Sequence, residues 1–454
     1  MGCLEKVAII HYRAGRTDGV SLEIDKRQSI LKRLGMDVSI VSGPVEKGSD
    51  FIIEALEFDT PEMVEIKENS FKHFQKNSIS PDVLMEKIWK FSQQIEEQFL
   101  IFHRQKQFDA LLLHNIFGFA LHLPAFSAFA NIVRNLKIPT ISTNHDYYWE
   151  RPEYLEPVNS RVQKYMDTYI LPNDDCITHI SINSIAQEKL RELKGISSTV
   201  IPDVFDFKQD SWQRDKFNSD FLSSIGVKEN DLVVLQATRI IERKGIEVAM
   251  RFVKELARKK DELAGKILYN GKRLDKTSNV VFVLAGYAEK MAEPYLDKLK
   301  EKASRIGIQA KFIGDKIGME RSSAPEKIYS LWDAYVHADL VTYPSIIEGW
   351  GNQFIEAIFA KKPVVVFEYP VFKKDIKPEG YHYISLGDRI YRQDESGLIR
   401  IPEQQLQATV NAAIETLTAP NTPQKLEENF SIGTKYHDLE VTERFLRKKL
   451  CKDG

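Results

Sequence analysis

Short apolar runs recur along the first half of the chain, and a polar loop and an amphipathic stretch separate each run from the next. Lys6–His11 has the pattern of a short buried strand, and the helical pattern that follows it ends at Gly35, a residue suited to a helix C-terminus. Residues 61–106 are polar and rich in Lys, Glu and Gln, which predicts helices. Further strands are predicted at residues 38–41, 110–113 and 139–142. This alternation indicates a parallel sheet covered by helices.

A second alternation of strands and helices begins near Leu232. Its strands are predicted at residues 232–235, 281–284, 310–313, 339–342 and 364–366, and the polar stretch 208–218 before it is the best linker candidate. The expected fold class is therefore α/β, with two doubly wound Rossmann-like domains that face a cleft. We expect an N-terminal, acceptor-binding domain over 1–215 and a C-terminal, donor-binding domain over 216–435.

The composition is that of a globular protein and argues against nucleic-acid binding. The chain has 454 residues, 43% of them hydrophobic and 28% charged, as in globular proteins. Its 63 basic and 65 acidic residues give a net charge of -2, which argues against nucleic acid as a partner.

The three cysteines, Cys3, Cys176 and Cys451, lie far apart in the sequence. They predict neither a disulfide framework nor a zinc site, and they favour a reducing compartment. No apolar run reaches the length of a transmembrane helix, and the N-terminal residues lack an apolar signal core. A cytoplasmic location is therefore expected.

Polar residues follow the predicted strands directly, where ligands bind in open parallel sheets. In the first half these residues are His11, His114 with Asn115, and His145. In the second half they include Arg239, Gly286 and the loop that carries Glu348. Their convergence predicts a binding site, although a single histidine after a strand can also be a packing residue.

The stretch 343–357 carries the strongest chemical signal. Glu348 lies in a loop after a strand, Gly349 and Gly351 permit tight turns, and Asn352 begins a helix that contains Glu356. Free backbone N–H groups at a helix start can bind sugar hydroxyls or a diphosphate. Two solvated glutamates on a helix and its loop are the alternative interpretation.

Arg239 and Lys244, five residues apart, can hold two phosphates from one side. That arrangement suits a leaving nucleoside diphosphate, whose charge grows as the sugar bond breaks. Taken alone, the pair could equally be surface charge.

Together these stretches resemble the retaining glycosyltransferases of family 4, also described as glycosyl transferases group 1, which have the GT-B fold. The matching elements are Glu348 with Glu356, Arg239 with Lys244, the segment 200–206, the Gly19 loop, and His145-Asp146. Asp203 and Val204 replace the Asn and Gly that the family usually has in the segment 200–206. Residues 349–370 and 375–378 are similar to bacterial relatives that build glycosylated glycerate solutes.

The resemblance implies a role for each matching residue. Arg239 and Lys244 would hold the donor diphosphate, Glu356 the ribose, and Glu348 the transferred hexose. His145 would lie beneath the anomeric carbon. Further donor contacts would come from Gly19, Gly286, Trp350, Gly351 and Asn352. Residues 436–454 would form a helix that crosses back to the N-terminal domain.

The resemblance also implies an enzyme, a hexosyltransferase that keeps the anomeric configuration. It would use a nucleotide-sugar donor such as GDP-mannose, UDP-glucose or ADP-glucose, and a small polar acceptor such as a sugar or a glycerate-type solute. No cofactor is expected. No Asp-x-Asp metal element is present, so the reaction is expected to be independent of metal ions.

The acceptor is expected to contact His11, His114, Asn115, Tyr147 and Arg151, although these aromatic residues could instead pack the domain. Two other functions stay open: a peripheral-membrane lipid or polysaccharide glycosyltransferase, for which the stretch 71–76 is the one hint, and a nucleotide-sugar-binding protein without activity. The sequence leaves open the base, the hexose, the acceptor and whether the chain forms a homo-oligomer.

Overall fold

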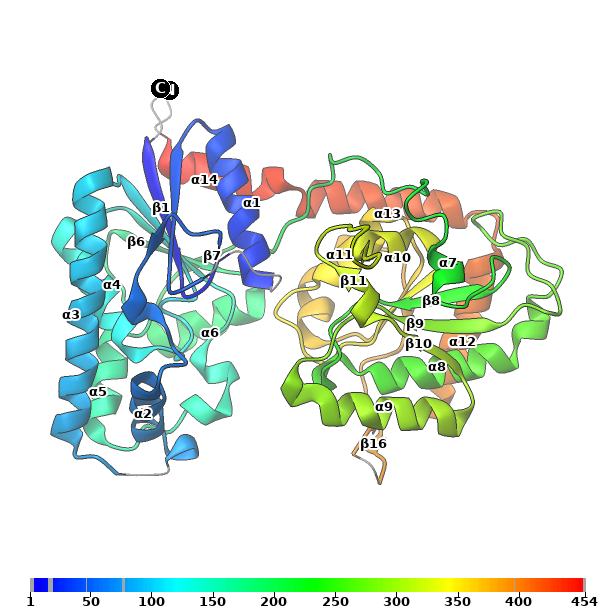
Figure 1. Cartoon of the computed structure of the whole chain (residues 1–454), viewed down its shortest axis with the longest axis horizontal. Coiled ribbons are helices and arrows are strands. Elements are labelled where there is room, and N and C mark those ends of the chain that lie inside the picture. Colours follow the sequence, from blue (N-terminus) through cyan, green and yellow to red (C-terminus); the bar gives the residue numbers. More distant parts are fainter. Residues whose placement is uncertain (1–3, 15–18, 46, 76–77, 396, 452–454) are drawn as a thin grey trace. The chain divides into compact units, whose positions relative to one another are not determined.

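The computed structural model describes residues 4–14, 19–45, 47–75, 78–395 and 397–451. They form two compact units (Figure 1). The first contains the chain up to Val204 together with the C-terminal helix α14 (Leu439–Leu450), and the second is Phe205–Asp438. Both units are built on parallel sheets, so the predicted α/β class with two doubly wound domains is confirmed.

The first unit has a seven-stranded sheet in the order β3-β2-β1-β4-β5-β6-β7, with every pairing parallel. Its strands are β1 (Lys6–His11), β2 (Asp37–Ser42), β3 (Phe51–Ile52), β4 (Ala110–His114), β5 (Thr140–Asn144), β6 (Ile177–Ser181) and β7 (Ser198–Val200). Its helices are α1 (Gly19–Arg33), α2 (Pro61–Ser70), α3 (Pro81–Lys106), α4 (Leu123–Leu136), α5 (Ser160–Tyr169), α6 (Ser184–Lys194) and α14. The predicted helices over 61–106 are present as α2 and α3, each of which starts with a proline after a capping Thr60 or Ser80.

The two faces of this sheet bury separate apolar clusters. Ala8 and Ile10 of β1 pack in one cluster with α3 and α4, whereas Val7 and Ile9 pack in the other with α1 and α14. Alternate residues of a strand point to opposite faces, which produces this division. In Figure 1, α14 (red) accordingly lies beside α1 (blue).

The second unit has a six-stranded parallel sheet in the order β10-β9-β8-β13-β14-β15. Its strands are β8 (Leu232–Gln236), β9 (Val280–Leu284), β10 (Gln309–Phe312), β13 (Leu340–Tyr343), β14 (Val364–Val366) and β15 (Ile384–Ser385), with short pairs β11 (Ile317–Gly318) with β12 (Tyr329–Ser330) and β16 (Arg392–Gln393) with β17 (Ile399–Arg400). Its helices are α7 (Phe221–Ser224), α8 (Ile246–Arg258), α9 (Glu293–Ile306), α10 (Leu331–His337), α11 (Asn352–Phe359), α12 (Glu403–Thr418) and α13 (Thr422–His437). In Figure 1, α8 and α9 cover one face of the sheet, and α10, α11 and α13 cover the other.

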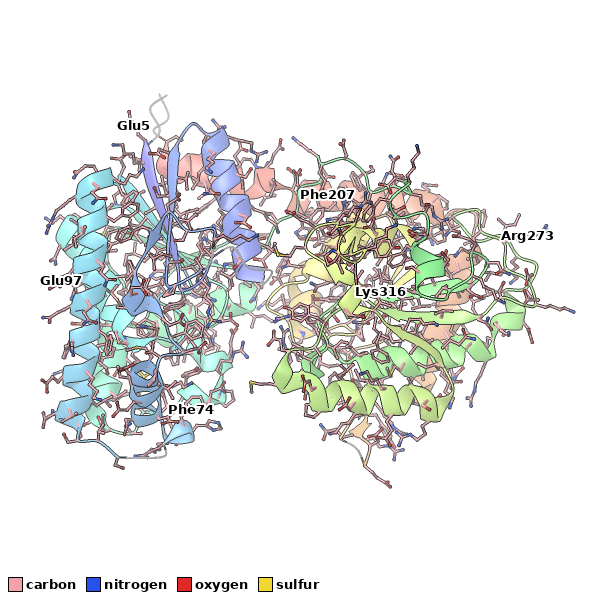
Figure 2. The ribbon with its side chains drawn as sticks, in the orientation of Figure 1. Glu5, Phe74, Glu97, Phe207, Arg273 and Lys316 are labelled. Atoms are coloured by element: carbon pink, nitrogen blue, oxygen red, sulfur yellow. The ribbon has the colours of Figure 1, made fainter. Side chains whose placement is uncertain are left out.

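The division between the units falls after Val204, ahead of the polar stretch that suggested a boundary at 215. Aromatic packing explains the difference. The ring of Phe205 lies 4.9 Å from that of Phe359, and Trp212 stacks on Trp332 at 3.8 Å, so this stretch belongs to the second unit. Phe207, which is labelled in Figure 2, belongs to the same aromatic group, because its ring lies 5.8 Å from that of Phe359.

The cysteines depart from expectation. Cys451 is disulfide-bonded and Cys176 is a free thiol, whereas the spacing predicted no disulfide; Cys3 lies outside the described residues. Sequence spacing fails here because it carries no information on which residues distant in the chain are neighbours in the fold. No described helix is both long and apolar enough to cross a membrane.

Candidate functional site

Three histidines meet at the carboxyl ends of adjacent strands in the first unit. His11 ends β1, His114 ends β4, and His145 follows β5. His11 Nδ1 lies 2.8 Å from the carbonyl oxygen of His114, and His114 Nδ1 lies 3.2 Å from His145 Nε2. Burial, with smaller effects from Arg27 and the neighbouring histidines, lowers the pKa of His114 well below its ordinary value. His114 is therefore a neutral partner for His145.

Asn115 holds the loop that carries His145. Its backbone is left-handed, with φ of 54°, and its side-chain oxygen accepts hydrogen bonds from the peptide N–H groups of His145 and Asp146 at 2.7 and 3.1 Å. Asn115 Nδ2 donates to the Asp146 carboxylate at 3.2 Å, and Arg151 donates to the same carboxylate at 3.0 Å. His145 and its loop are thus fixed by neighbouring side chains before any ligand binds.

A buried group of charges lies next to His145. His145 Nδ1 is 3.5 Å from Asp203 Oδ1, and both side chains are almost buried. Glu23 and Arg27 of α1 are wholly buried, and no guanidinium nitrogen of Arg27 forms a hydrogen bond within the described part of the chain. Burial lowers the pKa of Arg27, and the charges of Glu23 and Asp203 oppose that change. The group joins α1 to the His145 loop electrostatically.

The predicted acceptor contacts have different surroundings. His114, Asn115 and Tyr147 are buried, and the Tyr147 hydroxyl pairs with Ser181 at 2.7 Å while its ring stacks on Trp149 at 4.4 Å. These positions fit packing and support better than direct contact with an acceptor. Arg151 is more accessible, and His11 is half-buried. Gly19 is exposed at the start of α1; residues 15–18 of its loop lie outside the described residues.

In the second unit, Lys244, Arg243 and Glu348 form one charged cluster. Lys244 Nζ contacts one Glu348 oxygen, and Arg243 Nη1 donates to the other at 2.6 Å. Lys244 is followed by Gly245, whose φ is +58°; a Cβ there would lie 2.5 Å from the carbonyl oxygen of Pro344. Glycine therefore allows the start of α8 to approach the loop that carries Glu348.

The pKa of Glu348 reflects this cluster. Burial raises it, but the positive charges of Lys244 and Arg243 outweigh burial and hold the pKa below its ordinary value. Glu348 is therefore ionised at neutral pH. The family resemblance implies that Lys244 contacts the diphosphate and Glu348 the hexose, and in the structure the two side chains contact each other directly.

Arg239 follows β8 and donates to Glu289 at 2.6 Å in an exposed ion pair. Gly286 follows β9, and a Cβ there would lie 1.8 Å from the Thr238 carbonyl oxygen. The absence of a side chain at Gly286 thus permits the close approach of the loops after β8 and β9, which sets the position of Arg239.

Glu356 lies in α11 and accepts a hydrogen bond of 3.0 Å from the hydroxyl of buried Tyr335. At the start of α11, Tyr369 donates to the Trp350 carbonyl oxygen at 2.6 Å, and a Cβ at Gly351 would lie 2.7 Å from the Tyr369 oxygen. Trp350 is itself buried, whereas Asn352 is half-buried. The predicted donor residues of the second unit thus gather at the strand ends, around the starts of α8 and α11.

Several supporting residues were missed from the sequence: Glu23, Arg27, Arg243, Glu289, Tyr335 and Tyr369. Glu23 and Arg27 had a signal, because they occupy helical positions on the same buried side as Ile24 and Ile30. Glu289 and Tyr335 had none, since their partners are distant in the sequence. No three His, Cys, Asp or Glu side chains among the described residues are grouped so that they could hold a metal ion.

Residues 219–430 match the family model for glycosyl transferases group 1. The chain is 37% identical to the mannosylglucosylglycerate synthase of Petrotoga mobilis over 88% of this chain and 92% of that protein. It is 35% identical to the synthase of the same name from Thermotoga maritima, over 98% of this chain and 99% of that one. The chain therefore belongs to the group 1 glycosyltransferases, and it is a hexosyltransferase.

The fold comparison agrees with this assignment. A sucrose-phosphate synthase from Thermosynechococcus elongatus superposes with a TM-score of 0.61 at 14% identity, and the match covers 98% of both chains. This similarity concerns the fold alone, which is that of GT-B enzymes, as expected from the sequence.

Proposed function

We propose that this enzyme transfers a hexose from a nucleoside-diphosphate hexose to a glycerate-type acceptor, and that its product is a mannosylglucosylglycerate. The observation that carries the proposal is the similarity to two mannosylglucosylglycerate synthases, which in one case extends over 98% of the chain at 35% identity. GDP-mannose is the first donor to test, with UDP-glucose and ADP-glucose as alternatives.

The proposed chemistry uses charges on both sides of the breaking bond. The bond from the anomeric carbon to the diphosphate breaks, positive charge develops on the sugar, and Arg239 and Lys244 balance the negative charge on the leaving group. An acceptor hydroxyl attacks from the face that the diphosphate leaves, and its proton passes to a departing phosphate oxygen. The α configuration is then retained. Ionised Glu348 faces the developing positive charge in this scheme, and no metal ion is required.

The alternative of a lipid glycosyltransferase is less favoured. Phe71, in the stretch that suggested a membrane contact, is fully buried, and its ring packs edge to face with that of Tyr154 at a centroid distance of 5.2 Å. It is therefore not an apolar tip available to a membrane. Lys76 of the same stretch lies outside the described residues. A cytoplasmic location remains a prediction from the sequence.

The test is a matrix of three donors, GDP-mannose, UDP-glucose and ADP-glucose, against glycerate, glucosylglycerate and a diacylglycerol. Products are identified by mass spectrometry, and proton NMR of the first-formed product assigns its configuration. Transfer from GDP-mannose to glucosylglycerate with an α linkage is expected. Transfer to diacylglycerol alone contradicts the acceptor class, and a β linkage contradicts retention. Arg239→Ala should lose most activity, while the matched surface variant Arg273→Ala should keep it.

A further inference from the structure

A polar cavity lies in the Phe205–Asp438 unit. Its volume is about 700 Å³, and its walls come from α8, α9, the β16–β17 hairpin and the start of α12. Along α8 it extends from Arg251 to Arg258, whereas Lys244 precedes that helix. None of the residues proposed to hold the donor lines it.

The lining carries seven basic and four acidic side chains, a net formal charge of +3. Four of the basic groups lie in ion pairs: Arg251 pairs with Glu403 at 2.5 Å and Arg258 with Glu255 at 2.8 Å, whereas Lys302 and Arg400 share the single Asp394 carboxylate at 3.7 and 3.5 Å. Lys254, Arg305 and Arg392 form no ion pair with any described residue. Positive charges that line a concave site produce a positive potential inside it. The cavity therefore attracts anions.

Lys302 provides the second observation. Its side chain is 4% exposed, and its Nζ forms no hydrogen bond within the described part of the chain. The Asp394 carboxylate lies 3.7 Å from Nζ, beyond hydrogen-bond distance, and the same oxygen lies 3.5 Å from Arg400 Nη2. A buried ammonium without a hydrogen bond is costly, and an anionic oxygen in the cavity would supply the missing acceptor.

Hydrogen bonds of the buried Glu247 carboxylate connect the elements that form the cavity wall. Glu247 of α8 accepts a hydrogen bond of 3.0 Å from the Ile399 N–H of β17, and its other oxygen accepts from the Tyr295 hydroxyl of α9. One buried carboxylate therefore connects three of the four elements that form the cavity. The site is preformed, as binding sites for small molecules generally are.

We propose that this cavity binds a small soluble ligand that carries two phosphate groups, at a site separate from the donor site. A diphosphate matches the excess positive charge of the lining, and the planar guanidinium groups of Arg305 and Arg392 suit phosphate oxygens. Lys302 would bind a phosphate oxygen at the inner end. This inference does not depend on the identity of the hexose or the acceptor.

The test is isothermal titration of pyrophosphate into an Arg239→Ala protein, in which phosphate binding by the donor residues is weakened. Saturable binding is expected. Adding Arg305→Ala and Arg392→Ala should weaken it at least tenfold, whereas adding Arg273→Ala should change it less than twofold. Both cavity arginines and Arg273 are exposed (Arg273 is labelled in Figure 2), so the fold should survive, and thermal melts check that it does. Lys302→Met should weaken binding as well.

Two outcomes overturn the proposal. One is pyrophosphate binding that is absent, or that is unchanged by the double cavity substitution. The other is cosedimentation with phosphatidylglycerol vesicles that the double substitution abolishes, together with no binding of free pyrophosphate. That second result would assign the patch to lipid phosphate.

Discussion

Glu348→Ala would leave Lys244 buried without its carboxylate partner, and the cost can be worked from the exposed fractions of the side chains. Lys244 is 6% exposed and Glu348 9%, whereas Arg243, at 35%, can turn to water. Removing one member of a buried ion pair costs about 3–5 kcal/mol. Because Arg243 can be solvated, we expect a loss of about 3 kcal/mol. For a unit of this size that corresponds to a fall in Tm of roughly 6–12 °C.

The assay combines thermal melts with steady-state kinetics on six proteins: wild type, Glu348→Ala, Glu348→Gln, Glu348→Leu, Lys244→Met and the double variant Glu348→Leu with Lys244→Met. The double variant replaces the ion pair by apolar groups and should recover most of the stability that each single variant loses. Activity should not return with stability, because both residues are proposed to act on the donor. Glu348→Gln, which keeps a hydrogen-bond acceptor, should lower kcat by about ten- to a hundredfold, more than it raises KM for the donor.

The pH dependence gives an independent check. The pKa of Glu348 lies below its ordinary value of 4.5 in the folded protein, so its contribution to stability is complete above that value and is lost as the pH falls through the folded pKa. The difference in Tm between wild type and Glu348→Gln should therefore close in acid. A loss below about 1 kcal/mol for Glu348→Ala, or an active double variant, would refute the reasoning.

Three other outcomes are expected. Glu356→Gln should raise KM for the donor with little change in kcat. Tyr335→Phe should raise KM less, because the Tyr335 hydroxyl only orients Glu356. A fall in kcat as large as the rise in KM would contradict a ribose contact. Glu289→Gln should lower KM for the donor about two- to fivefold, because it releases Arg239 from an exposed ion pair whose energy is at most about 1 kcal/mol. A raised KM would contradict this expectation. Activity should persist in EDTA, and loss that magnesium or manganese restores would show that Arg239 and Lys244 do not suffice.

The sequence predicted the sheets well because apolar runs mark buried parallel strands directly, as β1, β4 and β8 show. It also located the strand-end residues, since topology places strand carboxyl ends together. The sequence did not reveal the ion-pair partners of these residues. Lys244 pairs with Glu348 and Arg239 with Glu289 because particular loops meet in the fold, and sequence spacing does not show which loops meet. Tyr147 was predicted to contact the acceptor but packs in the core. An aromatic residue near a predicted site has the same sequence pattern in both cases, so the sequence cannot separate them.

The supporting charges follow one physical rule in both units. Glu348 and Lys244 in the second unit, and Asp203 and His145 in the first, are buried polar or charged side chains in loops that follow strands. Such groups stabilise a fold less well than apolar packing would, so their stability alone does not explain them. We propose that they fix charge and hydrogen-bond direction before a ligand binds, which would favour a transition state whose charge develops in a known place. Asp203, which replaces the usual residue of the family at this position, lies 3.5 Å from His145 Nδ1, and we propose that it orients that ring.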